Sequence, residues 1–141
     1  MLVSSGQIEY APVIAELYRQ CFSNNWSVSD IQKILALPTT IGWVTEKSFL
    51  LCSRVLDEME IISIGVLPAY RQMHLASNLI TDLIAYATRE KIKKIFLEVS
   101  ILNMPAQGLY TKFGFKQTGI RHGYYQTENG PVDALCLAKM L

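Results

Sequence analysis

The sequence predicts an α+β fold: a mixed, mostly antiparallel twisted sheet flanked by about four helices. Three observations lead to this prediction. Segments with apolar residues at helical spacing alternate with strand-like apolar runs. Two pairs of neighbouring runs are separated by only two residues, which favours antiparallel hairpins. The passage from 58 to 100 is long enough for a strand–helix–strand crossover, which is parallel and right-handed.

The first part of the chain is expected to form two helices and three strands. A helix near 11–22 follows from Pro12, which suits a first turn, and from the apolar spacing behind it. Ser27 can cap a short helix near 28–36, which Pro38 ends. Strands are expected at 40–45, 48–55 and 58–66.

The second part is expected to form two helices and three further strands. An apolar stripe predicts a helix over about 75–90, and Pro105 opens another helix that stops at Gly114. The run 95–100 is typical of a buried strand. Closing strands are expected at 115–119 and 134–140.

Composition excludes several classes of protein. With 141 residues, of which 50% are hydrophobic, the chain should form one domain over 1–141. The net charge of +1 does not favour nucleic-acid binding. We expect no signal peptide and no membrane span, hence a cytoplasmic protein, because no apolar stretch approaches the required length. Three cysteines without a CxxC pair, and two histidines, predict buried free thiols and no metal site.

A possible anion site lies where the third strand ends. Pro68 is followed by a turn containing Arg71, and then by the long helix. The first N–H groups of a helix have no partner inside it, and they lie at the positive end of its dipole. Such a junction can bind phosphate, although a plain capped turn has the same pattern.

The stretch from Val66 to Ala76 resembles the pyrophosphate-binding motif of GNAT acetyltransferases, Arg/Gln-x-x-Gly-x-Gly/Ala after a Val-x-Pro strand end. The resemblance implies that acetyl-coenzyme A is the cosubstrate. Backbone amides of the turn would hold its pyrophosphate, and the preceding strand would pair with its pantetheine arm. The residues implied to bind the cofactor are Ile64, Gly65, Val66, Arg71, Gln72, Met73, His74, Leu75, Ala76, Ser77 and Asn103.

His74 departs from this motif, because it stands where the family has its first glycine. Glycine at such a position lets the backbone approach the phosphate closely. A histidine is compatible with phosphate binding if its φ is negative and its ring points outward. We expect binding to be retained, because the rest of the motif set is intact. A protonated ring could donate a further hydrogen bond to the pyrophosphate, or the ring could obstruct the site.

Acetyl transfer from a thioester to an amine requires a proton acceptor for the amine and a proton donor for the leaving thiolate. Glu98 is a carboxylate within an apolar strand, and Tyr110 lies on a helix beside an aromatic residue. From the residues alone, a charge at a strand end for Glu98 and a core aromatic for Tyr110 are the more common interpretations. The pattern Leu-Glu-Val-x3-Asn-x2-Ala-x2-Leu-Tyr-x3-Gly-Phe over 97–115 resembles the ribosomal-protein-alanine N-acetyltransferase (RimI-like) branch of GNAT. The resemblance implies that Glu98 accepts the proton, Tyr110 donates one and Asn103 contacts coenzyme A.

The same resemblance implies that the acceptor is a protein N-terminus, possibly alanine on a ribosomal protein. An α-amine has a pKa of about 7.7–8.0 against about 10.4 for lysine, so it loses its proton more easily. Tyr124 and Tyr125 are expected to line the peptide site, and the acidic run 57–60 to attract a basic tail. A small-molecule amine, a protein lysine or a non-catalytic coenzyme A-binding module remain alternatives. We expect a monomer or a weak dimer.

Overall fold

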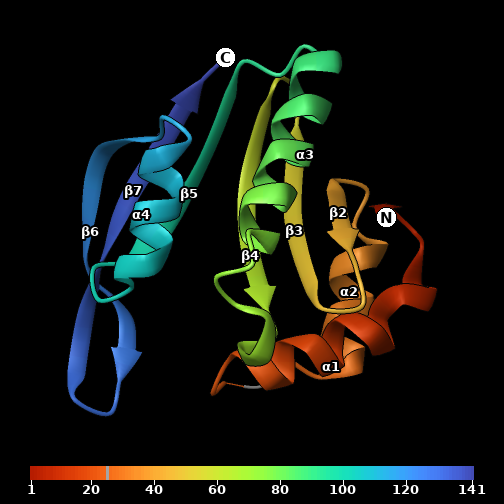
Figure 1. Ribbon diagram of the computed structural model, residues 1–141, viewed down its shortest axis with the longest axis horizontal. Helices are drawn as coiled ribbons and strands as arrows, with labels where there is room; N and C mark the ends of the chain where they lie inside the picture. The colour runs from red at the N-terminus through yellow and green to blue at the C-terminus, as the bar shows by residue number, and fades with distance from the viewer. Residues whose placement is uncertain (25) are drawn as a thin grey trace.

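The computed structural model describes residues 1–24 and 26–141, which form a seven-stranded sheet in the order β1-β2-β3-β4-β5-β7-β6 (Figure 1). The strands are β1 (Leu2–Ser4), β2 (Thr40–Val44), β3 (Ser48–Val55), β4 (Glu58–Val66), β5 (Lys94–Ser100), β6 (Lys116–Thr127) and β7 (Gly130–Met140). The helices are α1 (Ala11–Cys21), α2 (Val28–Ala36), α3 (Leu75–Arg89) and α4 (Met104–Lys112), with 3-10 turns η1 (Ile8–Tyr10) and η2 (Pro68–Tyr70). The predicted fold class is confirmed.

The start of α2 shows how local chemistry fixes a helix end. The Ser27 hydroxyl accepts a hydrogen bond from the Asp30 amide at 3.1 Å, and the Ser27 amide donates to the Asp30 carboxylate at 3.0 Å. This capping box satisfies two backbone donors that the first turn would otherwise leave free. The predicted cap at Ser27 is therefore confirmed.

The helices divide into two layers, one on each face of the sheet. Residues of α1 and α2 pack with Val44, Phe49 and Leu51 in one hydrophobic core. Residues of α3 and α4 pack in a second core with alternate residues of the same strands, such as Leu50 and Cys52. Because strand side chains alternate between faces, these two sets lie on opposite sides of the sheet.

The predicted parallel crossover connects β4 to β5, and these two strands pair over a short distance only. The ladder holds three pairs, from Glu58 with Lys94 to Glu60 with Phe96. Beyond them β5, β7 and β6 swing away from β4, as the widening separation toward the bottom of Figure 1 shows. A bulge in the β3–β4 ladder, between Leu51 and Cys52, lies close to this divergence.

Strand boundaries differ most from expectation at the end of the chain. The strands expected at 115–119 and 134–140 are β6 over Lys116–Thr127 and β7 over Gly130–Met140, so they form one long hairpin. Most of β6 is exposed, and it therefore lacks the apolar alternation by which strands are recognised. The remaining predicted elements agree with the structure to within two residues at each end.

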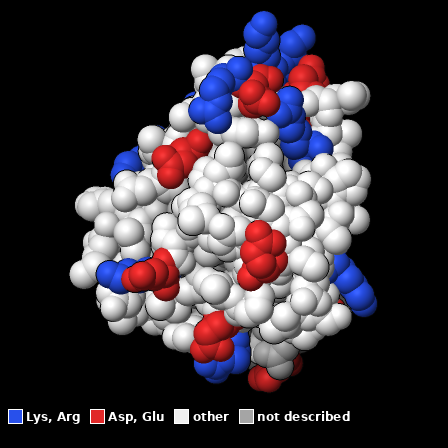
Figure 2. Space-filling model, turned by 90° about the vertical axis from the view of Figure 1, so that its right-hand side faces the viewer, with Lys and Arg blue, Asp and Glu red and all other residues white. Residues whose placement is uncertain are grey.

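Figure 2 shows the side of the molecule that carries the N-terminus and β2. Much of this surface is uncharged. Lys and Arg side chains gather with Asp and Glu side chains near the end of the molecule where α3 ends. On this face of the described chain the two signs are mixed rather than separated.

Candidate active site

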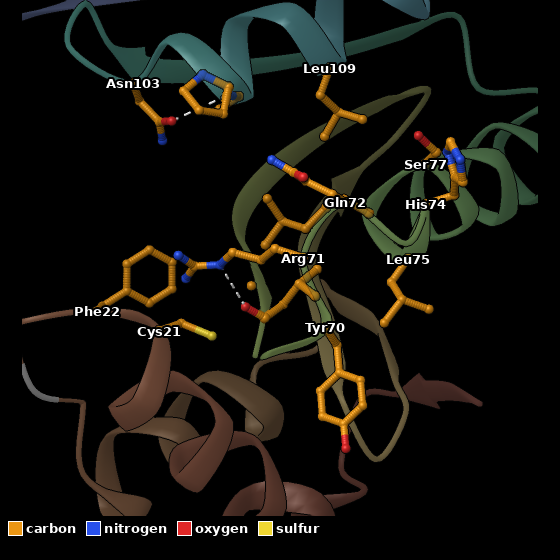
Figure 3. Close-up of a pocket in the computed structure, with 16 residues that line it drawn as sticks. Cys21, Phe22, Tyr70, Arg71, Gln72, His74, Leu75, Ser77, Asn103 and Leu109 are labelled. Atoms are coloured by element: carbon orange, nitrogen blue, oxygen red, sulfur yellow. Dashed lines mark hydrogen bonds between the residues drawn. The ribbon is translucent and has the colours of Figure 1, made fainter. Parts of the chain in front are cut away.

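A cleft of about 760 Å³ lies between β4, the start of α3, α4 and the end of α1 (Figure 3). It brings together every predicted cofactor-binding residue except Met73, which is exposed and does not line it. The lining residues are Cys21, Phe22, Ile64, Gly65, Val66, Tyr70, Arg71, Gln72, His74, Leu75, Ala76, Ser77, Asn103, Pro105, Ala106 and Leu109.

The turn before α3 has an unusual backbone. Gln72 and His74 both have φ of 63°, in the left-handed region, and Met73 between them does not have a positive φ. Alternation of this kind points successive N–H groups to one side and makes an anion-binding concavity. His74 is also the residue that precedes the first turn of α3, where backbone donors lack helical partners. The backbone therefore offers the cleft several donors together with the positive end of a helix dipole.

The condition of a negative φ at His74 is not met, because its φ is 63°. The turn requires the left-handed conformation at this position, which is the conformation glycine adopts without strain. Histidine is among the side chains that enter this region more often than most, so the turn forms, at a cost of about 1 kcal/mol. His74 is exposed at the edge of the cleft.

Arg71 folds back on the end of β4 rather than reaching out to solvent. Its Nε donates a hydrogen bond to the Val66 carbonyl at 3.1 Å, which Figure 3 shows beside Phe22 and Cys21. Burial raises the pKa of the Cys21 thiol, and the nearby Arg71 charge opposes that rise. Cys21 is the last residue of α1 and Phe22 follows it directly, and the sequence did not predict either at this site.

Gly65 is the point where β4 comes closest to the aromatic side chains beneath it. A Cβ built on Gly65 would lie 2.6 Å from the Phe49 ring and 3.1 Å from the Cys21 sulfur. No side chain fits there without movement of the ring. Glycine keeps this stretch of β4 flat and open toward the cleft.

Asn103 caps a helix and also lines the cleft. Its Oδ1 accepts a hydrogen bond from the Ala106 amide at 3.2 Å and so caps α4. The same side chain lines the cleft, with its amide nitrogen turned toward the side occupied by Arg71 and Phe22 in Figure 3. An amide has donors to spare after accepting one bond.

A second cluster of predicted residues surrounds Glu98, on β5, outside the lining of the cleft. The Glu98 side chain is 18% exposed, and its Oε1 lies 2.8 Å from Nε of Arg121. Tyr125 donates a hydrogen bond from its hydroxyl to the Glu98 carbonyl at 3.3 Å. Hydrogen bonding to the Glu98 side chain raises the pKa of Tyr124, whose ring lies 5.0 Å from that of Tyr125. Arg121 is the member of this cluster that the sequence did not single out.

Tyr110, on α4, lies in the core between α4 and the sheet. It is 3% exposed and packs edge-on against Phe115 at 5.4 Å. Burial raises the pKa of its phenol, and the nearby Cys52 and Tyr125 add to that rise. The hydroxyl therefore keeps its proton at physiological pH.

Glu60, on β4, is a second charged side chain near Glu98, in addition to Arg121. Burial raises the pKa of Glu60 first, and the Glu98 charge raises it further, while Arg121 opposes both effects. The three side chains are therefore close enough to influence one another. They lie on the face of the sheet opposite α3, because Met59, Ile61 and the alternate residues of β5 face the α3 core.

Neither a cluster of metal ligands nor a membrane-spanning helix occurs among residues 1–24 and 26–141. They contain no group of three or more His, Cys, Asp or Glu side chains arranged to hold a metal ion. None of the helices described is long and apolar enough to cross a membrane.

A mixed sheet that opens between two parallel strands, with an anion-binding turn at the head of the crossover helix, is the arrangement of an acyl-coenzyme A-dependent transferase. Residues 11–115 match the acetyltransferase (GNAT) family. The chain belongs to this family and is an acetyl-CoA-dependent N-acetyltransferase.

Comparison with individual proteins gives a consistent result. The chain is 31% identical over 141 residues to a Bacillus subtilis protein provisionally named as a ribosomal protein bS18-alanine N-acetyltransferase, covering 96% of this chain and 92% of that protein. It is 34% identical over 91 residues to the Escherichia coli ribosomal protein bS18-alanine N-acetyltransferase, covering 64% of this chain and 62% of that protein.

Solved structures share the whole fold. The crystal structure of the Escherichia coli ribosomal-protein-S18-alanine N-acetyltransferase superposes with a TM-score of 0.88 at 25% identity, over 99% of this chain and 92% of that chain. Arabidopsis thaliana NAA60 in complex with acetyl-CoA superposes with a TM-score of 0.81 at 16% identity, over 100% of this chain and 97% of that chain. The latter likeness concerns the fold alone.

Proposed function

We propose that this enzyme transfers the acetyl group of acetyl-CoA to the N-terminal α-amine, with alanine as first residue, of a ribosomal or other protein in the cytoplasm. The observation that carries the proposal is the similarity to the Bacillus subtilis protein over 96% of this chain, which includes the acceptor side as well as the cofactor motif. The proposal treats 1–141 as a single acetyltransferase domain that acts as a monomer or weak dimer. The sheet, whose strands run from Leu2 to Met140, supports the single domain.

In the proposed reaction Glu98 accepts a proton from the acceptor ammonium, directly or through a water molecule. The neutral nitrogen then attacks the thioester carbonyl carbon, and collapse of the tetrahedral adduct forms the amide and breaks the carbon–sulfur bond. Tyr110 donates its proton to the departing thiolate and recovers one from the nitrogen adduct. Its buried, protonated phenol supports this role, because a donor must hold its proton until the bond breaks.

The cleft supports the proposed binding of coenzyme A in two parts. The amides from Gln72 to Ser77 would hold the pyrophosphate, since they lie in a left-handed turn at the head of α3. Backbone groups of Ile64, Gly65 and Val66 would pair with the pantetheine arm along β4, with Asn103 opposite. These residues all line one cleft.

The acceptor would approach from the other face of the sheet, where Tyr124 and Tyr125 flank Glu98. A smaller cavity of about 270 Å³ adjoins this region and contains Asp57, Glu58 and Glu60. Carboxylates around an acceptor site would attract the basic tail of a ribosomal protein.

The proposal is tested by coenzyme A release with a peptide that begins with alanine, followed by mass spectrometry of the product. Tyr110→Phe should lower kcat about 100-fold while the peptide KM changes little, because only leaving-group protonation is lost. Tyr86→Phe is the matched control: Tyr86 is also buried and its hydroxyl binds Arg54, away from the cleft. Activity only on small-molecule amines or on lysine side chains would contradict the proposed acceptor. It would leave the proposed cofactor site intact.

A further inference from the structure

Arg121 reaches Glu98 across an intervening strand. Arg121 lies on β6 and Glu98 on β5, and β7 separates these strands in the sheet. Arg121 pairs with Ala134, which in turn pairs with Ser100, so all three lie on the face that carries Glu98. Two strand spacings amount to about 10 Å, a span that a long arginine side chain crosses when the residue between is small. Ala134 is that small residue.

Two contacts hold the guanidinium in place. Its Nε lies 2.8 Å from Oε1 of Glu98. Its centre lies 5.1 Å from the centroid of the Tyr124 ring, within the range of a cation–π contact. The Glu98 side chain also raises the pKa of Tyr124, so Tyr124 lies close to both Glu98 and Arg121. Arg121 remains 58% exposed, whereas Glu98 is 18% exposed.

We propose that Arg121 is a positioning residue for acetyl transfer, which fixes the Glu98 carboxylate toward the acceptor. The inference rests on the proposed role of Glu98 as proton acceptor. Arg121 touches neither substrate nor reacting atoms in this scheme and acts through Glu98 alone.

The surroundings of Glu98 explain why a cation is needed there. A second carboxylate, Glu60, lies on the neighbouring strand and interacts with Glu98. The Glu98 charge raises the pKa of Glu60, and the Arg121 charge opposes that rise. The Arg121 guanidinium therefore offsets the repulsion between the two carboxylates. The titratable and charged groups facing Glu98 are Glu60 from β4, Arg121, Tyr124 and Tyr125 from β6, and Cys136 from β7.

The test compares kcat and KM of Arg121→Gln and Arg121→Lys, with an alanine peptide. Arg121→Gln should lower kcat about tenfold and leave the peptide KM nearly unchanged, because misplacing a general base removes part of its contribution of about 100-fold or more. Arg121→Lys should restore part of kcat, because an ammonium group can still pair with the Glu98 carboxylate.

A double-substitution cycle distinguishes positioning from a structural or substrate-binding function. In the Glu98→Gln background, Arg121→Gln should change kcat by less than about twofold, because coupled residues do not act additively. Arg54→Gln is the control: it removes an Arg–Glu contact of 2.9 Å at Glu90, remote from the cleft, and should leave kcat unchanged. Additive losses, no rescue by Arg121→Lys, or a raised KM at constant kcat would overturn the inference. A wild-type enzyme that acetylates none of the amines tested would instead refute the proposed function.

Discussion

Replacing His74 with glycine should stabilise the protein without changing its affinity for coenzyme A. His74 has φ of 63° and ψ of 15°, at the last position before α3. A residue with a Cβ pays about 1–2 kcal/mol in this region, and histidine lies toward the lower end of that range. Glycine removes this strain but gains about 0.5–1 kcal/mol of unfolded-state entropy. The free energy of unfolding should therefore rise by about 0.5 kcal/mol, or about 1–3 °C in Tm for a chain of this size.

Coenzyme A affinity should change by less than about twofold, because the turn is already left-handed before the ligand binds. Strain that is equal in the free and bound states cancels from the binding free energy. The measurements are thermal unfolding and a calorimetric titration with coenzyme A, on the wild type, His74→Gly and His74→Ala.

His74→Ala separates the ring from the backbone, since it removes the imidazole and keeps the Cβ. It should be no more stable than the wild type. Equal stabilisation by alanine and glycine would refute the backbone argument. A tenfold loss of affinity in both variants would mean that the ring contacts the pyrophosphate, and a tenfold gain would mean that it obstructs the site.

Three further predictions concern the cleft and the acceptor side. Gly65→Ala should destabilise the protein by about 1–3 kcal/mol in denaturant unfolding, because its Cβ would lie 2.6 Å from the Phe49 ring; unchanged stability would mean that the ring moves freely. The KM for a basic alanine peptide should rise with ionic strength if the carboxylates at 57–60 attract it, whereas a neutral peptide should show a flat response. Coenzyme A should slow amide exchange along 61–66, with the β6–β7 hairpin tip as an unaffected internal reference; protection confined to the hairpin would place the ligand elsewhere.

Much of the fold could be predicted because its signals are local. The strands at 48–55 and 58–66 are joined by a two-residue turn. The position of this turn sets the end of the first strand and the start of the second. The helix at 28–36 begins at Ser27, where the cap and the apolar period agree. Such features depend on residues a few positions apart, so a single sequence contains them.

Elements held by distant pairing could not be predicted in this way. β1 has three residues, Leu2–Ser4, and exists because it pairs with β2 about forty positions later. The hairpin of β6 and β7 shifts register between Arg121 and Tyr125, so its alternation breaks and its outer part resembles a loop. In both cases the deciding contact is tertiary.

The same distinction applies to the site. The turn from Arg71 to Ser77 is contiguous, and a motif therefore identifies it. Phe22 reaches the cleft through the packing of α1, and Arg121 reaches Glu98 across β7. Neither position has a sequence signal of its own. The left-handed φ of His74 has no signal in its residue type either, because the turn dictates the conformation.

The short ladder between β4 and β5 accounts for the position of both halves of the site. Glu60 and Phe96 form its last pair, and Glu98 is the next residue on that face of β5, the first without a partner on β4. Beyond the pair of Glu60 and Phe96, β4 and β5 no longer pair with each other along their facing edges. The backbone N–H and C=O groups on these edges therefore require another hydrogen-bonding partner. A pantetheine arm with its two amides can supply one from the α3 side. An amine that approaches Glu98 from the opposite face would then meet the thioester where the strands separate, so one truncated ladder serves both substrates.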